Sequence, residues 1–119
     1  CHHPLEEPPG FERGETRNGP AALGQMAQAG VRVALSGHLH HWAMGLGIEG
    51  LDRRPVFQMQ TGTALCARAR EQDHGFALLE VTPATLSACA VIWDAQAQAY
   101  LPRPSRAYAW AEGGWGLVG

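Results

Sequence analysis

The sequence predicts an α/β fold with one helix and mostly β-strands, and two observations carry this prediction. Residues 20–36 show the patterns of a helix, a glycine turn and a strand in succession, which is the building unit of α/β proteins. Beyond residue 41, short apolar segments separated by glycine and proline replace any helical pattern. The length of 119 residues suits one ordinary domain.

The first predicted element is a short helix that follows a loop over residues 5–19. It begins near Pro20, because proline is favoured at the first helical position. Gly30 is placed to end it as a left-handed cap. The side chains at positions i, i+3 and i+4 of its apolar stripe are Leu23, Met26 and Ala27.

A buried strand is predicted over residues 31–36, directly after the helix. Its alternation places Val31, Val33 and Leu35 on one face. The strand leads into the polar loop 37–40, Gly-His-Leu-His. In open α/β sheets, ligands collect outside the carboxyl ends of strands, so this loop is a candidate site.

The middle of the chain is predicted to be weaker β-structure. Residues 41–48 alternate loosely, and two glycines interrupt the pattern. Residues 55–60 are typical of a strand, and the segment 61–64, Thr-Gly-Thr-Ala, ends it.

The last third of the chain is predicted to contain a hairpin and further short strands. Residues 76–81 and 85–93 are strongly apolar and separated by a short connection, which favours an antiparallel hairpin. Tyr100 and Tyr108 indicate one or two further strands. The glycine-rich segment 112–119 is predicted to be a loose tail.

Composition and charge exclude several classes of protein. Apolar residues make up 45% and charged residues 17%, which are globular values. A net charge of −2 and a pI near 6.3 give no electrostatic footprint for a nucleic-acid polymer or an anionic membrane. No apolar run approaches the roughly 18 residues of a membrane span. The three cysteines show no Cys-x-x-Cys spacing, so we expect reduced thiols and a cytoplasmic location.

Histidine is the informative residue type, because five of the six histidines fall in two short clusters. In an extended segment His38 and His40 would project to the same side. His2 and His3 are neighbours, so an extended backbone would send only one of them toward a shared site. One imidazole from the first cluster and two from the second would make a three-imidazole metal site.

These clusters and several later motifs resemble a known family. The segments concerned are His2-His3-Pro4-Leu5, Val33-Ala34-Leu35-Ser36-Gly37-His38-Leu39-His40, Gln60-Thr61-Gly62-Thr63-Ala64, Arg68-Ala69-Arg70 and His74-Gly75-Phe76. In this order, over residues 1–95, the chain is similar to the C-terminal half of calcineurin-like metallophosphoesterases. The later segments resemble the bacterial cyclic-nucleotide-phosphodiesterase-like branch.

The resemblance implies a four-layer α/β-β-α sandwich that hydrolyses phosphoesters, as a phosphodiesterase or phosphatase acting on small molecules. It implies two divalent ions, Mn, Fe or Zn, with His2 and His38 on one ion and His40 on the other. In that family, two ions about 3.5–4 Å apart lower the pKa of a bridging water, so that hydroxide attacks phosphorus near neutral pH.

The chain also departs from the family's pattern. The family's Asp-x-His, Gly-Asp and Gly-Asn-His-Asp motifs, which supply a bridging Asp, an Asn ligand and a His that contacts the phosphate, are absent. The acidic residues Glu6, Glu7 and Glu49 lie in predicted loops and are expected to face solvent. Residues 1–101 are therefore expected to be the C-terminal part of a longer domain, and 102–119 a final strand or tail.

From this departure we expect an incomplete metal centre. The two ions would be held only when the N-terminal half is supplied, and the general acid would come from that half. The isolated chain is expected to be inactive, and either to bind the missing half or to self-associate.

Further candidates and alternative readings remain at this point. His41, Arg68 and Arg70 are candidate substrate contacts, since a guanidinium fork suits phosphate, although a solvated loop is the simpler role for the two arginines. His3 is expected to turn away from the metal. The alternatives are a non-catalytic metal-binding or protein-interaction module, and a β-rich protein that holds one ion through His2, His38 and His40 together with a carboxylate.

Overall fold

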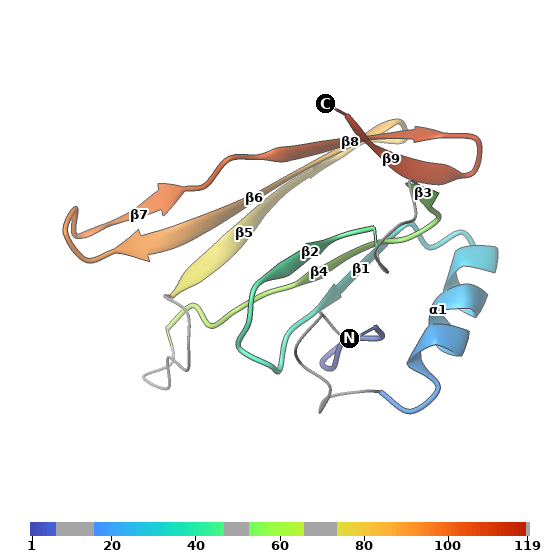
Figure 1. Cartoon of the computed structure of the whole chain (residues 1–119), viewed down its shortest axis with the longest axis horizontal. Coiled ribbons are helices and arrows are strands. Elements are labelled where there is room, and N and C mark those ends of the chain that lie inside the picture. The colour runs from blue at the N-terminus through green and yellow to red at the C-terminus, as the bar shows by residue number, and fades with distance from the viewer. Residues whose placement is uncertain (7–15, 47–52, 66–73, 119) are drawn as a thin grey trace.

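The computed structural model describes residues 1–6, 16–46, 53–65 and 74–118 (Figure 1). Within these ranges it contains one helix and nine strands. The elements are α1 Gly19–Gln28, β1 Val33–Ser36, β2 Ala43–Gly45, β3 Arg53–Arg54, β4 Phe57–Gln60, β5 Gly75–Val81, β6 Thr85–Asp94, β7 Ala99–Pro102, β8 Arg106–Ala111 and β9 Gly114–Val118.

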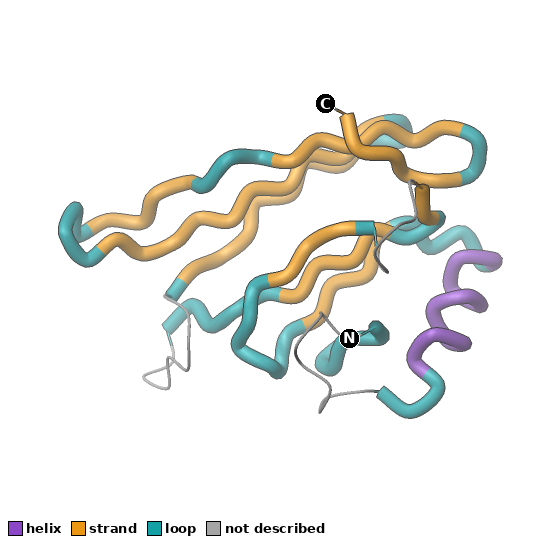
Figure 2. Tube along the Cα trace, in the orientation of Figure 1, coloured by secondary structure: helices purple, strands orange, loops and turns teal. Residues whose placement is uncertain are grey.

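The strands form two sheets, and the helix lies against one of them. The smaller sheet has the order β1-β4-β2, with β1 and β4 parallel and β2 antiparallel to β4. The larger sheet is antiparallel, with the order β3-β9-β8-β6-β5 and with β7 paired to β6. Figures 1 and 2 show the smaller sheet between α1 and the larger sheet. The fold is therefore α+β, because parallel pairing is confined to β1 and β4.

The main core lies between the two sheets. Its buried members are Phe57, Met59, Leu86, Ala88, Tyr108 and Trp115. Phe57 and Met59 point the same way because alternate residues of a strand share a face. Trp115 is fully buried, and its Nε1 donates a hydrogen bond to the Arg32 carbonyl oxygen at 2.9 Å. This bond joins the larger sheet to the segment that enters β1.

A second, smaller core lies between α1 and the smaller sheet. Leu5, Leu23 and Val56 are its buried members, and the partly buried Met26, Ala27 and Ala34 pack against it. The predicted apolar stripe of the helix is thus confirmed. Gly30 has φ 86°, and the amides of Gly30 and Val31 bond to the carbonyls of Ala27 and Met26. This is the paired bonding of a glycine-capped helix end, as predicted.

Residues 33–36 form a strand as predicted, but the prediction that this strand is buried is wrong. Among the described strands β1 is the terminal strand of the smaller sheet, and on its other side the short N-terminal segment bonds to Leu35 and Gly37. Leu35 is 46% exposed and Val31 37% exposed. Periodicity identified the strand, but burial depends on which strands flank it.

The later strands confirm the hairpin and correct the tail. β5 and β6 pair antiparallel with Gly75 opposite Ile92 and Val81 opposite Leu86. Tyr100 and Tyr108 lie in β7 and β8. The segment 112–119 is not a loose tail, because β9 within it pairs with β8 and β3 and buries Trp115. Within the described residues, no helix has the length and apolarity needed to cross a membrane.

Candidate metal centre

The N-terminal residues are fixed beside the carboxyl end of β1. The amino group of Cys1 donates to the Leu35 carbonyl oxygen at 2.8 Å, and the Gly37 amide donates to the His2 carbonyl oxygen at 3.0 Å. Leu5 is buried against the helix, where a Cβ on Gly19 would overlap the Leu5 carbonyl oxygen. These contacts place His2 next to the loop that follows β1.

His38 lies at the centre of a tight turn in that loop. The Leu39 amide donates to the Gly37 carbonyl oxygen at 2.9 Å, and His38 has φ 72°. An i to i+2 hydrogen bond around a positive φ defines the rarer, strained form of the γ-turn. His40 also has a positive φ, 54°. The prediction that His38 and His40 project from an extended segment is therefore wrong, because both residues are left-handed.

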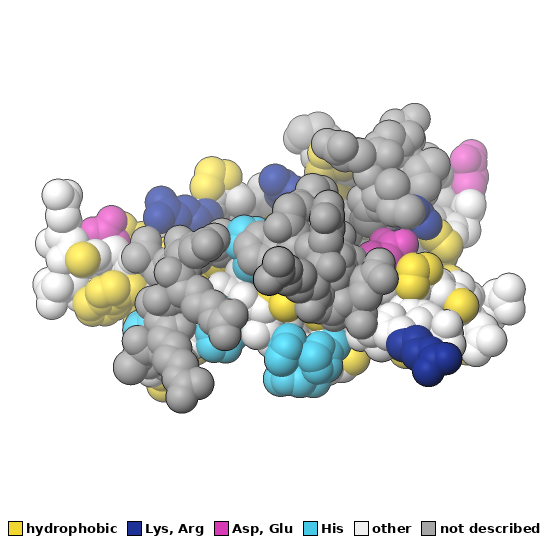
Figure 3. Space-filling model, turned by 60° about the horizontal axis from the view of Figure 1, so that its bottom comes forward, with side chains coloured by type: hydrophobic (Ala, Val, Ile, Leu, Met, Phe, Trp, Pro, Cys, Tyr) yellow, Lys and Arg dark blue, Asp and Glu magenta, His cyan; other side chains and the backbone are white. Residues whose placement is uncertain are grey.

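Three imidazoles meet at the surface beside this turn. One ring nitrogen from each of His2, His3 and His38 lies within 4.8 Å of the others, and all three residues are exposed. The His38 Nδ1 and His2 Nε2 atoms are 3.0 Å apart. The ring centroids of His3 and His38 are 3.9 Å apart. Figure 3 shows histidine side chains gathered in a compact surface patch.

The structure brings together only part of the predicted site. His2 and His38 converge as expected, but His3 joins them, although an extended backbone would send it the other way. His40 is half-buried and lies outside this three-imidazole group. His41 is also half-buried, and its carbonyl oxygen accepts a hydrogen bond from Gln60 Nε2 at 3.0 Å.

Other predicted residues are elsewhere or outside the described ranges. The Glu6 carboxylate accepts a hydrogen bond from Gln58 and is half-buried, so it does not face solvent as expected. Arg68, Arg70, Glu7 and Glu49 lie outside the described residues.

The segment that follows β4 lies beside the histidine loop. The Thr61 amide donates to the Ser36 carbonyl oxygen at 2.9 Å, and a Cβ on Gly37 would lie 3.8 Å from Thr61 Oγ1. The cause is the parallel pairing of β1 and β4, which brings both carboxyl ends to one sheet edge. The sequence motif at residues 61–64 did not predict this position beside the histidines, because local patterns do not reveal the order of strands in a sheet.

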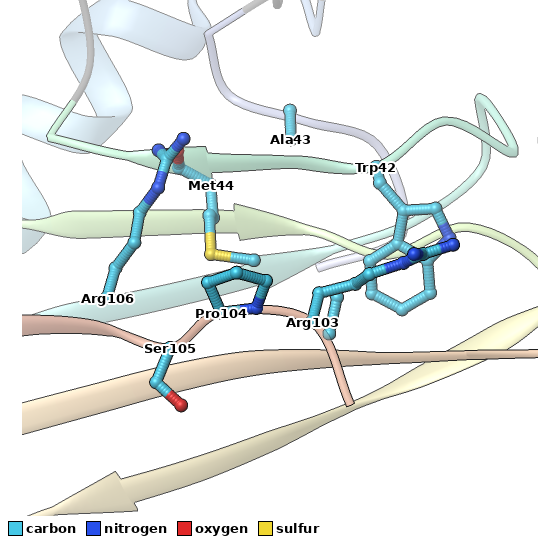
Figure 4. Close-up of a pocket in the computed structure, with 8 residues that line it drawn as sticks. Trp42, Ala43, Met44, Arg103, Pro104, Ser105 and Arg106 are labelled. Atoms are coloured by element: carbon cyan, nitrogen blue, oxygen red, sulfur yellow. The ribbon is translucent and has the colours of Figure 1, made fainter. Parts of the chain in front are cut away.

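A pocket of about 540 Å³ lies between the two sheets, lined in part by Trp42 and Met44. The other wall of the pocket is formed by the β7–β8 connection and the start of β8. Pro102 pairs with Val91 and Arg106 with Ala88, so three residues of the connection lie opposite two residues of β6 and form a bulge. Arg103 in the bulge and Arg106 next to it line the pocket (Figure 4). Arg106 Nη1 donates to the Met44 carbonyl oxygen at 3.2 Å. Sequence reasoning missed this pocket, because the bulge depends on strand register.

The His2–His38 pair of the three-imidazole group has the spacing of ligands on one metal ion. In a tetrahedral site with metal–nitrogen bonds of 2.0–2.1 Å, adjacent ligand nitrogens are about 3.3 Å apart. The 3.0 Å separation of the His2 and His38 nitrogens is close to that value. Among the described residues the group contains no carboxylate and does not include His40. His2 and His38 therefore fit the first of the two implied ions, and the ring nitrogens that are up to 4.8 Å apart would have to draw closer for a third imidazole to join them. The described group does not supply ligands for the second ion.

Comparison with solved structures identifies the fold. The chain is similar to the crystal structure of a single-residue variant of Vps29 from Entamoeba histolytica, with a TM-score of 0.52 and 14% sequence identity. The match covers 87% of this chain and 52% of that one, so this chain spans about half the length of the matched protein. Vps29 has the calcineurin-like metallophosphoesterase fold, and this chain shares that fold. No protein-family profile and no curated protein sequence matches the chain.

Proposed function

We propose that this chain is the C-terminal part of a metal-dependent phosphoester hydrolase. The observation that carries the proposal is the convergence of His2 and His38 at the carboxyl end of β1, with their ring nitrogens 3.0 Å apart. The fold shared with Vps29 supports the same class. In the whole enzyme the two sheets would form the inner layers of a four-layer sandwich, with residues 1–101 in the domain and 102–119 as its last strands.

In this proposal the histidines divide between two ions. His2 and His38 hold one ion, His40 holds the other, and the missing N-terminal half supplies the carboxylates. When bound, two such ions activate water for attack on phosphorus and neutralise the phosphoryl oxygens. The γ-turn of this chain fixes the direction of the His38 ring. His41, with Arg68 and Arg70, would contact the phosphoester substrate.

An exposed strand edge supports a partner for this part of the molecule. Among the described strands, β5 ends the larger sheet, and Leu78 on this strand is 55% exposed. Such edges pair readily with another chain segment. The proposed partner is the N-terminal half of the same protein, and a second copy of the chain would replace it when that half is absent. The free thiols of Cys1 and Cys89 are compatible with the cytoplasmic location proposed here.

The test uses the protein encoded by the complete reading frame that contains this chain. With Mn²⁺ and bis(p-nitrophenyl) phosphate, we expect turnover by the complete protein and none by the 119-residue chain. His38→Ala and His40→Ala should each lower kcat by about 100-fold or more, since loss of a hydrogen-bond partner behind a metal ligand already costs 10- to 100-fold. His74→Ala is the matched control and should keep full activity.

Two outcomes would contradict the proposal. Turnover by the isolated chain would show that no second half is needed. A complete protein that carries metal but hydrolyses no phosphoester would instead support the non-catalytic metal-binding or protein-interaction module. That alternative is favoured by one observation, namely that the described three-imidazole group contains no carboxylate.

A further inference from the structure

We propose that His3, and not His40, is the third imidazole ligand of a single-ion site in this chain. The site would consist of His2, His3 and His38 and would bind one divalent transition-metal ion without any residue from another polypeptide. This inference goes beyond the hydrolase proposal, since it rests only on the geometry of these three side chains.

The three rings are close enough to share one ion. One nitrogen of each ring lies within 4.8 Å of the other two. The His2 ring is steeply inclined to both neighbours, at 89° to His3 and 69° to His38, while the His3 and His38 rings lie with their centroids 3.9 Å apart at 43°. Rotations of these exposed side chains would bring the three nitrogens around one ion.

The backbone around His2 and His3 is fixed on both sides. Before them, the Cys1 amino group bonds to Leu35 of β1. After them, Pro4 is buried and its carbonyl oxygen accepts a hydrogen bond from Thr16 Oγ1 at 2.9 Å. A ligand pair held at both ends loses less conformational entropy when an ion binds.

On the opposite side of the site, a tight turn holds His38. The γ-turn places a left-handed backbone at His38, a conformation that costs about 1–3 kcal/mol in a residue other than glycine. Such strain is often found where a side chain must be aimed at a ligand. His40 has its own left-handed backbone and is half-buried outside the group. The loop geometry thus separates His38 from His40.

The donor set indicates the class of ion. Three neutral imidazoles without a described carboxylate or thiolate suit borderline ions such as Zn²⁺ and Co²⁺, whereas Mg²⁺ and Ca²⁺ prefer oxygen ligands. Three histidines with one open position are a known arrangement for zinc. We therefore expect one Zn²⁺ or Co²⁺ per chain.

The experiment is a titration of the metal-free 119-residue chain with Co²⁺, followed by visible absorption and by displacement with Zn²⁺. His2→Ala, His3→Ala and His38→Ala should each weaken binding by about 100-fold or more, beyond the 10- to 100-fold cost of losing an outer hydrogen bond. His74→Ala is the matched control and should leave the Kd unchanged. His40→Ala discriminates between the two third ligands and should weaken binding less than His3→Ala does. Near-UV circular dichroism checks the fold, which these exposed substitutions should preserve.

Ni²⁺ and Cu²⁺ are avoided, because a free amino terminus with histidine at the third position binds them without a folded site. Loss of binding in His38→Ala excludes such terminal binding for Co²⁺. The inference is overturned if the parent chain binds no Co²⁺ saturably, or if His40→Ala weakens binding while His3→Ala does not. The titration contains no phosphoester, so its outcome is independent of the test for hydrolase activity.

Discussion

His38 has an unfavourable backbone conformation, and its ring lies beside that of His2 in the candidate metal site. Its φ of 72° and the bond from Leu39 to Gly37 form the γ-turn that aims its ring at His2. A glycine precedes it, yet the left-handed conformation falls on histidine. The backbone strain therefore belongs to the residue that the proposed site needs.

This strain gives a test with two substitutions that both remove the imidazole. His38→Gly should be about 1 kcal/mol more stable than His38→Ala, because only alanine carries a Cβ that opposes a left-handed backbone. Urea unfolding of the metal-free chain measures the difference. Equal stability, or a more stable alanine variant, would contradict the γ-turn at His38.

At this scale the sequence predicted that His2 and His38 lie close together, but not that His3 joins them. The convergence of His2 and His38 follows from motifs at the carboxyl end of a strand. The expectation for His3 assumed an extended backbone and side chains that alternate strictly between faces. The chain bends at His3, so the strict alternation fails there. The γ-turn at His38 has no reliable signature in the residues Gly37 to Leu39.

Among the elements, the parallel pair β1 and β4 positions the site, and Trp42 holds the neighbouring segments together. A Cβ on Gly62 would overlap Trp42 Nε1, and one on Gly75 would lie 3.1 Å from the same indole ring. Trp42 therefore contacts the backbone after β4 and the start of β5. It follows His41 directly, so its packing constrains the end of the histidine loop.

Gly62→Ala should destabilise the chain by about 1–3 kcal/mol, the usual cost of forcing extra volume into packed side chains. The control is Gly45→Ala, because a Cβ there would have no neighbour within 4 Å. Thermal unfolding followed by tryptophan fluorescence measures both variants. A Gly62→Ala chain as stable as the control would show that Trp42 does not pack against Gly62.

Elements with strong local signals were predictable, and those defined by long-range pairing were not. Pro20, the Leu23 stripe and Gly30 specify the helix within one short segment, and the β5–β6 hairpin has a short connection. β9 was not predicted, because its pairing with β8 and β3 outweighs the low strand propensity of its glycines. The Trp115 side chain, fully buried, provides the compensating burial.

At the scale of the whole molecule, local sequence patterns predict the strands of the core, whereas the candidate metal centre depends on long-range contacts between segments. Alternating apolar residues predicted strands, but not that β1 would be a sheet edge with Leu35 exposed. The site lies at this edge, where the N-terminal segment bonds to β1 and the segment after β4 lies alongside. The candidate centre therefore combines three separate parts of the sequence. The sequence shows the order of these parts along the chain, but not how they lie beside one another in the fold.

The most direct measurement is anomalous X-ray diffraction at the zinc absorption edge from crystals of the chain grown with Zn²⁺. We predict one strong anomalous peak between His2, His3 and His38, with zinc–nitrogen distances of about 2.0–2.1 Å. An ion bound through His40 without His3, or no peak at the three imidazoles, would contradict this metal centre.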